Sequence, residues 1–93
     1  MAVAGRKHVP ISVWVPILLR VRGYVFFFRS SDGGERPHVH VKGNEGRAKL
    51  WLVPKVGLAR RGRYSKKRID EISRITAEHR EEWLDAWSRF FER

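Results

Sequence analysis

The residues from 37 to 53 constrain the fold more than any other stretch, because two alternating segments there flank a short glycine-containing loop. Residues 37–42 read PHVHVK and residues 47–53 read RAKLWLV. Alternation of apolar and polar residues is typical of a β-strand with one buried face. The four residues between them, GNEG, have the length and composition of a hairpin loop. The stretch therefore predicts an antiparallel β-hairpin.

A four-residue loop also predicts the register of this hairpin. Lys42 then lies opposite Arg47, His40 opposite Lys49, and His38 opposite Trp51. One face carries Val39, Val41, Ala48, Leu50 and Leu52, and the other carries His38, His40, Lys42, Arg47, Lys49 and Trp51. The first is an ordinary core face. Because unpaired buried charge is costly, we expect the second to stay uncovered, and it is the first candidate for a functional surface.

The remaining segments predict a small α+β domain. Residues 17–21 and 24–29 favour strands, the second of them central, and 30–36 favour a loop. Residues 56–59 are apolar enough to touch the core, but the sequence leaves their secondary structure open. From Lys66, after the N-cap candidate Ser65, apolar residues recur at helical spacing in two stripes. The stripes are Ile69, Ile72, Thr76, His79, Trp83, Ala86 and Phe90, and then Leu84, Trp87 and Phe91.

We therefore expect an antiparallel meander of three to four strands, covered on one face by a C-terminal helical segment. That segment is either one kinked helix or two helices that break near His79. Residues 1–9 are expected to form a flexible basic tail, with 10–16 extended at an edge, and residues 10–93 are expected to form a single domain.

Charge is the most informative part of the composition. The chain of 93 residues has a formal net charge of +10, and residues 1–68 hold 16 Lys/Arg against 3 Asp/Glu. Such a field suits nucleic acid, an acidic protein or another anionic surface. The lack of cysteine and of long apolar runs predicts a cytoplasmic protein with no membrane segment.

His38 and His40 are the candidate catalytic pair, with Lys49 across the hairpin. On a strand, residues two apart project from the same face, so both imidazoles can reach one substrate. Neighbouring cations would depress their pKa values, which favours a general base, with Lys49 stabilising an anion. This pattern allows a metal-independent ribonuclease. Equally, the two histidines can serve only as hydrogen-bonding groups on a sheet face.

A metal site is the weaker alternative for the histidine pair. Such a site needs at least three ligands, and the nearest carboxylates, Asp32, Glu35 and Glu45, fall in predicted loops. We therefore expect neither a metal nor another cofactor.

Basic residues near an aromatic ring indicate nucleic-acid binding. Trp51 can stack on a base, and residues 60–68 hold six cations at the start of the predicted helix. The predicted binding residues are Lys42, Arg47, Trp51, Arg60, Arg61, Arg63, Lys66 and Lys67. A non-catalytic module that binds an acidic partner, or a cryptic metal-binding protein, remains the alternative to an RNA-directed protein.

The chain also resembles the bacterial family of domain of unknown function 4160 over residues 16–91. The matching pieces are Gly23-Tyr24-x-Phe26-Phe27-Phe28, Pro37-His38-Val39-His40-Val41, Ala48-Lys49-Leu50-Trp51-Leu52 with Pro54, Leu58-Ala59 with Gly62, and Arg80-x-x-x-Leu84-x-x-Trp87-x-x-Phe90-Phe91. The resemblance implies a small α+β domain and a toxin–antitoxin-like pairing with a protein of the domain of unknown function 2442 family. It implies no particular activity.

Overall fold

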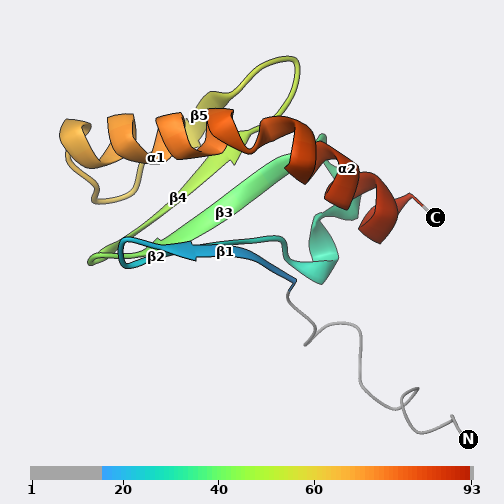
Figure 1. The fold of residues 1–93 in the computed structure, drawn as a ribbon, viewed down its shortest axis with the longest axis horizontal. Coiled ribbons are helices and arrows are strands. Elements are labelled where there is room, and N and C mark those ends of the chain that lie inside the picture. The colour runs from blue at the N-terminus through green and yellow to red at the C-terminus, as the bar shows by residue number, and fades with distance from the viewer. Residues whose placement is uncertain (1–15, 93) are drawn as a thin grey trace, which may run out of the picture.

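A computed structural model describes residues 16–92 of the chain. The strands are β1 (Ile17–Val21), β2 (Tyr24–Phe27), β3 (His38–Gly43), β4 (Gly46–Trp51) and β5 (Gly57–Arg60), and the helices are a 3₁₀ turn η3 (Ser30–Gly34), α1 (Lys66–Glu78) and α2 (Arg80–Phe91). The strands form one antiparallel sheet in the order β1-β2-β3-β4-β5, and both α-helices lie on one side of it (Figure 1). The α+β meander is confirmed, with five strands instead of three or four.

The strand that sequence reasoning left unassigned is β5. It pairs with β4 through Lys49 and Arg60 and through Leu50 and Leu58, with an irregularity between the two pairs. Leu58 remains exposed at this edge of the sheet. A short strand that is mostly exposed carries no clear alternation, so its pattern could not identify it.

The predicted hairpin register is confirmed at every pair from His38 and Trp51 to Lys42 and Arg47. The loop turns through Asn44 and Glu45, whose φ angles of 49° and 66° are both left-handed. The predicted core face is buried as a whole; its members are Val39, Val41, Ala48, Leu50 and Leu52. The alternation of the sequence therefore reports correctly which side chains face the helices.

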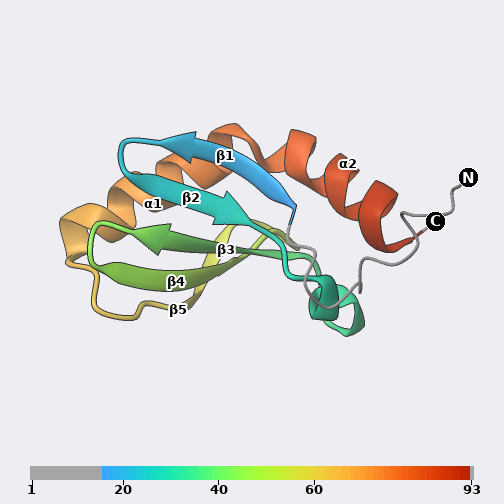
Figure 2. The ribbon, with the colours of Figure 1, turned by 90° about the horizontal axis from the view of Figure 1, so that it is seen from below.

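The helical segment consists of two helices, as the two stripes allowed. Ser65 is the N-cap of α1, and its hydroxyl accepts a hydrogen bond of 3.2 Å from the backbone N–H of Arg68. The helices meet at His79, whose ring stacks on that of Trp83 with centroids 5.1 Å apart. The buried residues of the two helices are Ile69, Ile72, Ile75, Thr76, Trp83 and Trp87. The break lets α2 reach the end of the sheet, where it approaches η3 (Figure 2).

Tyr64 ties the chain before α1 to the β3–β4 turn. Its buried hydroxyl lies 2.7 Å from the carbonyl oxygen of Gly43 and 2.9 Å from that of Gly46, and it donates to them. Tyr64→Phe removes this donor while keeping the ring. We expect a loss of about 1 kcal/mol in the free energy of unfolding, measured by urea titration. An unchanged unfolding midpoint would show that the hydroxyl does not hold the turn.

Two expectations concern parts of the chain that the structure does not describe. The predicted tail, residues 1–9, and nearly all of the predicted extended segment, 10–16, lie outside the described residues.

Within residues 16–92, neither helix has the length and apolar character that crossing a membrane requires.

Candidate functional site

The face of the sheet that points away from the helices, here called the outer face, carries cations from neighbouring strands. Lys42 of β3 lies between Val25 of β2 and Arg47 of β4. In the next row, His40 lies beside Lys49, which in turn lies beside Arg60. The register thus places like charges directly opposite each other twice, at Lys42 with Arg47 and at Lys49 with Arg60.

Such cross-strand pairs of like charge destabilise a sheet, so their presence needs a reason. Within residues 16–92, no ion pair joins Lys42, Arg47, Arg60 or Arg63 to a carboxylate. Lys49 differs, because its ammonium lies 2.6 Å from the carboxylate of Glu35. The outer face therefore keeps an uncompensated positive charge around Lys42 and Arg47.

The uncompensated cations gather around an open hollow beside the β3–β4 turn. Its charged lining is Lys42, Arg47, Arg60 and Arg63, with Glu45 at the turn. Arg29 lines an adjoining hollow with Lys42 and Arg47, and sequence reasoning missed it. A signal for it existed, because Arg29 continues the alternation that puts Val25 and Phe27 on the outer face. We call Arg29, Lys42, Arg47, Arg60 and Arg63 the basic patch.

Four predicted nucleic-acid-binding residues do not join the basic patch. Lys66 and Lys67 line a separate hollow at α1, and Lys66 is paired with Asp70. The Arg61 side chain donates to the carbonyl oxygen of Tyr64. The Trp51 ring is covered by the Arg36 guanidinium, 4.0 Å from its centroid, and by the Lys49 ammonium at 4.7 Å. Stacking of a base on Trp51 would have to displace Arg36.

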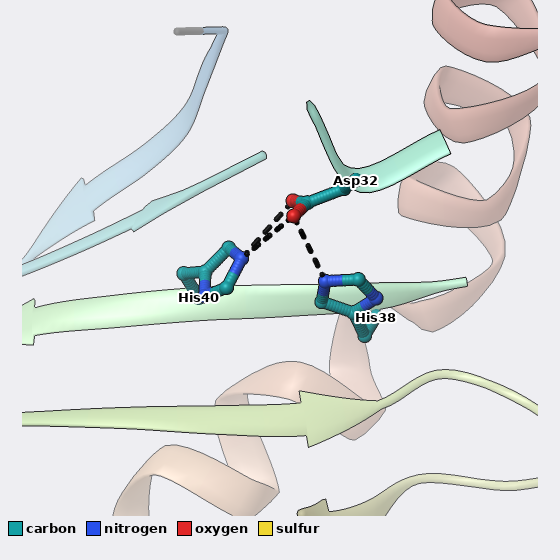
Figure 3. A group of neighbouring side chains, drawn as sticks. All are labelled: Asp32, His38 and His40. Atoms are coloured by element: carbon teal, nitrogen blue, oxygen red, sulfur yellow. Dashed lines mark hydrogen bonds and ion pairs between the residues drawn. The ribbon is translucent and has the colours of Figure 1, made fainter. Parts of the chain in front are cut away.

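His38 and His40 are buried, which corrects the expectation that the whole outer face stays uncovered. His38 is 0% exposed and His40 is 8% exposed. The His40 ring stacks on Phe27 with centroids 5.4 Å apart, and the His38 ring contacts Trp51 and Trp87. Burial is tolerated here because a polar group covers the histidines. That group is Asp32, on η3 (Figure 3).

Asp32 reaches both imidazoles from a turn that was expected to be only a loop. Its two carboxylate oxygens lie 3.2 and 3.0 Å from Nε2 of His40, and one of them lies 3.3 Å from Nε2 of His38 (Figure 3). The backbone N–H of Arg29 donates to the same carboxylate over 2.8 Å, which fixes its orientation. Asp32, His38 and His40 are called the histidine cluster below.

The histidine cluster shifts the pKa values of two of its members. Burial lowers the pKa of His40 below its usual range, although the hydrogen bond and the charge of Asp32 oppose this shift. For His40, the lowered pKa has the direction expected from the sequence, but its main cause is burial and not the neighbouring lysines. For Asp32, burial alone would raise the pKa, and the hydrogen bonds from Arg29 and His40 bring it below its usual range. Both shifts favour a carboxylate facing a neutral His40.

His38 is held more firmly than its place at the start of β3 suggested. Its Nδ1 lies 2.9 Å from the carbonyl oxygen of Arg36, and Glu35 lies 3.9 Å from the same nitrogen. Because both neighbours are acceptors, Nδ1 carries a proton and donates to Arg36. The three residues of the cluster together offer the ligand atoms that a metal ion requires. The third ligand is therefore Asp32, which the sequence analysis named among the nearest carboxylates but set aside because it falls in a predicted loop.

No curated protein and no solved structure matches the chain. The model of the family described as domain of unknown function (DUF4160) matches residues 23–88, which include β2, the histidine cluster, the basic patch and most of both helices. Since this match covers well over half of the 93 residues, the chain belongs to the DUF4160 family.

Proposed function

We propose that this protein binds the phosphate backbone of a nucleic acid, RNA in the first place, through the basic patch. The observation that carries the proposal is the like-charged cross-strand pair of Lys42 and Arg47, which no carboxylate among the described residues compensates and which lines one hollow with Arg60. A polyanion lying over them would turn a repulsion within the sheet into a set of favourable contacts. Arg29 and Arg63 extend the same field on two sides.

The choice of RNA and the proposed biological setting rest on the family resemblance and not on the charges of the patch. The family resemblance supports a role in a toxin–antitoxin-like pair in the bacterial cytoplasm, with a second small protein as its partner. An acidic partner protein is the alternative occupant of the same patch, since charge alone attracts either. The experiment below is arranged to separate the two.

Binding is proposed here, and cleavage is not. The predicted catalytic set was His38, His40 and Lys49. Because His38 is completely buried, its imidazole does not reach a bound polymer in this conformation. Lys49 forms an ion pair with Glu35. Of the three predicted catalytic residues, only His40 is then left, and it lies at the margin of a small hollow that also includes Lys49 and Arg60. The arrangement supports a surface that holds a backbone better than a site that breaks one.

The test is a double charge reversal, Lys42→Glu with Arg47→Glu. We expect affinity for a single-stranded RNA at about 50 mM salt to fall by at least about tenfold. In a plot of log affinity against log salt concentration, the wild type should give a steep negative slope. The double variant should reduce the magnitude of this slope by about 1.4, which corresponds to the loss of two phosphate contacts on a single strand. Fluorescence anisotropy over a salt series measures both quantities, with single-stranded and duplex DNA as competing ligands.

The matched control is Arg74→Glu with Arg89→Glu, two exposed helix residues outside the patch. This control changes the net charge by the same amount, so it corrects for long-range attraction. Equal losses in the two double variants would contradict a localised site. If the folded wild type binds neither RNA nor DNA, the acidic protein partner becomes the better assignment for the patch.

A further inference from the structure

The spacing of the histidine cluster suits a metal ion. One ligand atom from each of Asp32, His38 and His40 lies within 4.8 Å of the others. An ion about 2.0–2.2 Å from nitrogen and oxygen ligands in tetrahedral geometry holds neighbouring ligand atoms about 3.3 Å apart. The distances from the Asp32 oxygens to Nε2 of His40 and of His38 are 3.0 and 3.3 Å. These two separations already match the ion, and the two imidazole nitrogens, which lie within 4.8 Å of each other, would have to approach one another to bind it.

The second observation is an unpartnered nitrogen inside the cluster. Nδ1 of His38 carries its proton toward the carbonyl oxygen of Arg36, so Nε2 of a neutral His38 is a bare lone pair. This lone pair is buried, has no hydrogen-bond partner among the described residues, and faces a carboxylate oxygen of Asp32 at 3.3 Å. Two acceptors that face each other in a buried site repel. A cation between them, either a proton or a metal ion, removes the repulsion.

The surroundings resemble the outer shell of a protein metal site. An imidazole that binds a metal through Nε2 usually donates its Nδ1–H to a carbonyl or carboxylate, as His38 does to Arg36. The carboxylate of Asp32 is oriented in turn by the backbone N–H of Arg29. The closest lysine on the facing strand, Lys49, is neutralised by Glu35, which reduces its repulsion of a cation.

We propose that Asp32, His38 and His40 bind one divalent first-row transition-metal ion of the zinc type. Two imidazoles and one carboxylate form a donor set that zinc and its neighbours accept and that magnesium and calcium do not favour. The three proposed ligands are not members of the basic patch, although the backbone N–H of Arg29, a patch residue, orients Asp32. The metal proposal does not depend on whether the patch binds RNA.

The experiment uses the full chain, stripped of metal with a chelator and titrated with Zn²⁺ by calorimetry. We expect one equivalent per chain at this site, a melting temperature that rises with Zn²⁺ concentration, and no response to Mg²⁺. Asp32→Asn keeps the size of the side chain and an oxygen acceptor for the Arg29 N–H. We expect Asp32→Asn to weaken Zn²⁺ binding by more than about 100-fold, which is a larger loss than is typical when a residue that only contacts a metal ligand is replaced. His40→Gln is the second variant, and circular dichroism without metal checks that each variant folds.

The chain offers a matched control in the pair of His79 and Glu82. These residues form a histidine–carboxylate contact of 3.0 Å on the helix surface with no third ligand among the described residues. Glu82→Gln should leave Zn²⁺ affinity unchanged. The proposal is overturned if the folded wild type binds neither Zn²⁺ nor Co²⁺. In that case, the repulsion between Nε2 of His38 and the Asp32 carboxylate must be removed by a proton and not by a metal ion. Equal binding by wild type, Asp32→Asn and His40→Gln would also overturn it.

Discussion

Leu50→Ala is expected to lower the free energy of unfolding by about 2–5 kcal/mol. Leu50 is 0% exposed and lies opposite Val39 on the face of the sheet that packs against the helices. The substitution removes apolar contacts, and the surrounding strands and helices cannot close fully over the space that it leaves. Urea or thermal unfolding of the purified variant measures the loss.

Lys49→Ala is the control for this prediction, because Lys49 precedes Leu50 in β4 and points to the outer face. It removes an ion pair with the half-exposed Glu35, in which the Lys49 side chain is 15% exposed, and part of the cover over Trp51. We expect a cost of less than about 1 kcal/mol. Equal effects of the two substitutions would contradict the assignment of the two faces.

Trp83→Ala is expected to cost about 3–5 kcal/mol, as is usual when a large buried aromatic residue is truncated. Trp83 is 1% exposed and lies at the centre of the contact between α2 and the sheet. Its ring packs 5.2 Å from that of Phe26 and stacks on His79, so the truncation affects both the core and the junction of the helices. A urea titration followed by circular dichroism gives the value.

The same substitution at Trp51 serves as the comparison. Trp51 is half-buried on the outer face, where Arg36 and Lys49 cover its ring. Trp51→Ala should cost clearly less than Trp83→Ala, because its surface is only partly removed from water in the folded state. If Trp51→Ala proves as damaging as Trp83→Ala, the outer face must be packed more tightly than the structure shows.

The basic patch and the histidine cluster share the outer face but occupy different parts of it. Lys42 and Arg47 lie next to the β3–β4 turn, while His38 lies at the other end of β3, beneath η3. His40 lies between these ends and borders the small hollow with Lys49 and Arg60. The hollow also includes Arg29 and Arg47, so the two sites adjoin. Because the proposed metal ligands and the cations of the patch are different side chains, the RNA and zinc experiments test the two proposals separately.

The local features of this protein were predictable from its amino-acid sequence. A four-residue loop between two alternating segments sets the register, since a shift by one residue would expose Val39 and Leu50. Ser65 caps α1, and the two apolar stripes indicated a break near His79, although they left open whether the segment is one kinked helix or two helices. In each case the relevant interactions join residues that are close together along the chain or directly paired in one hairpin.

The segments that cover each face of the sheet could not be predicted in this way. Alternation shows that His38 and His40 share a side of the sheet, but it carries no information about a segment that folds over that side. The turn Ser30–Gly34 brings Asp32 onto both histidines, and α2 adds Trp87 at the end of the sheet. The physical reason is that a loop's path depends on contacts at both of its ends, whereas its composition indicates only that it turns. The buried cluster of two histidines and a carboxylate therefore had no signature in the spacing of its residues.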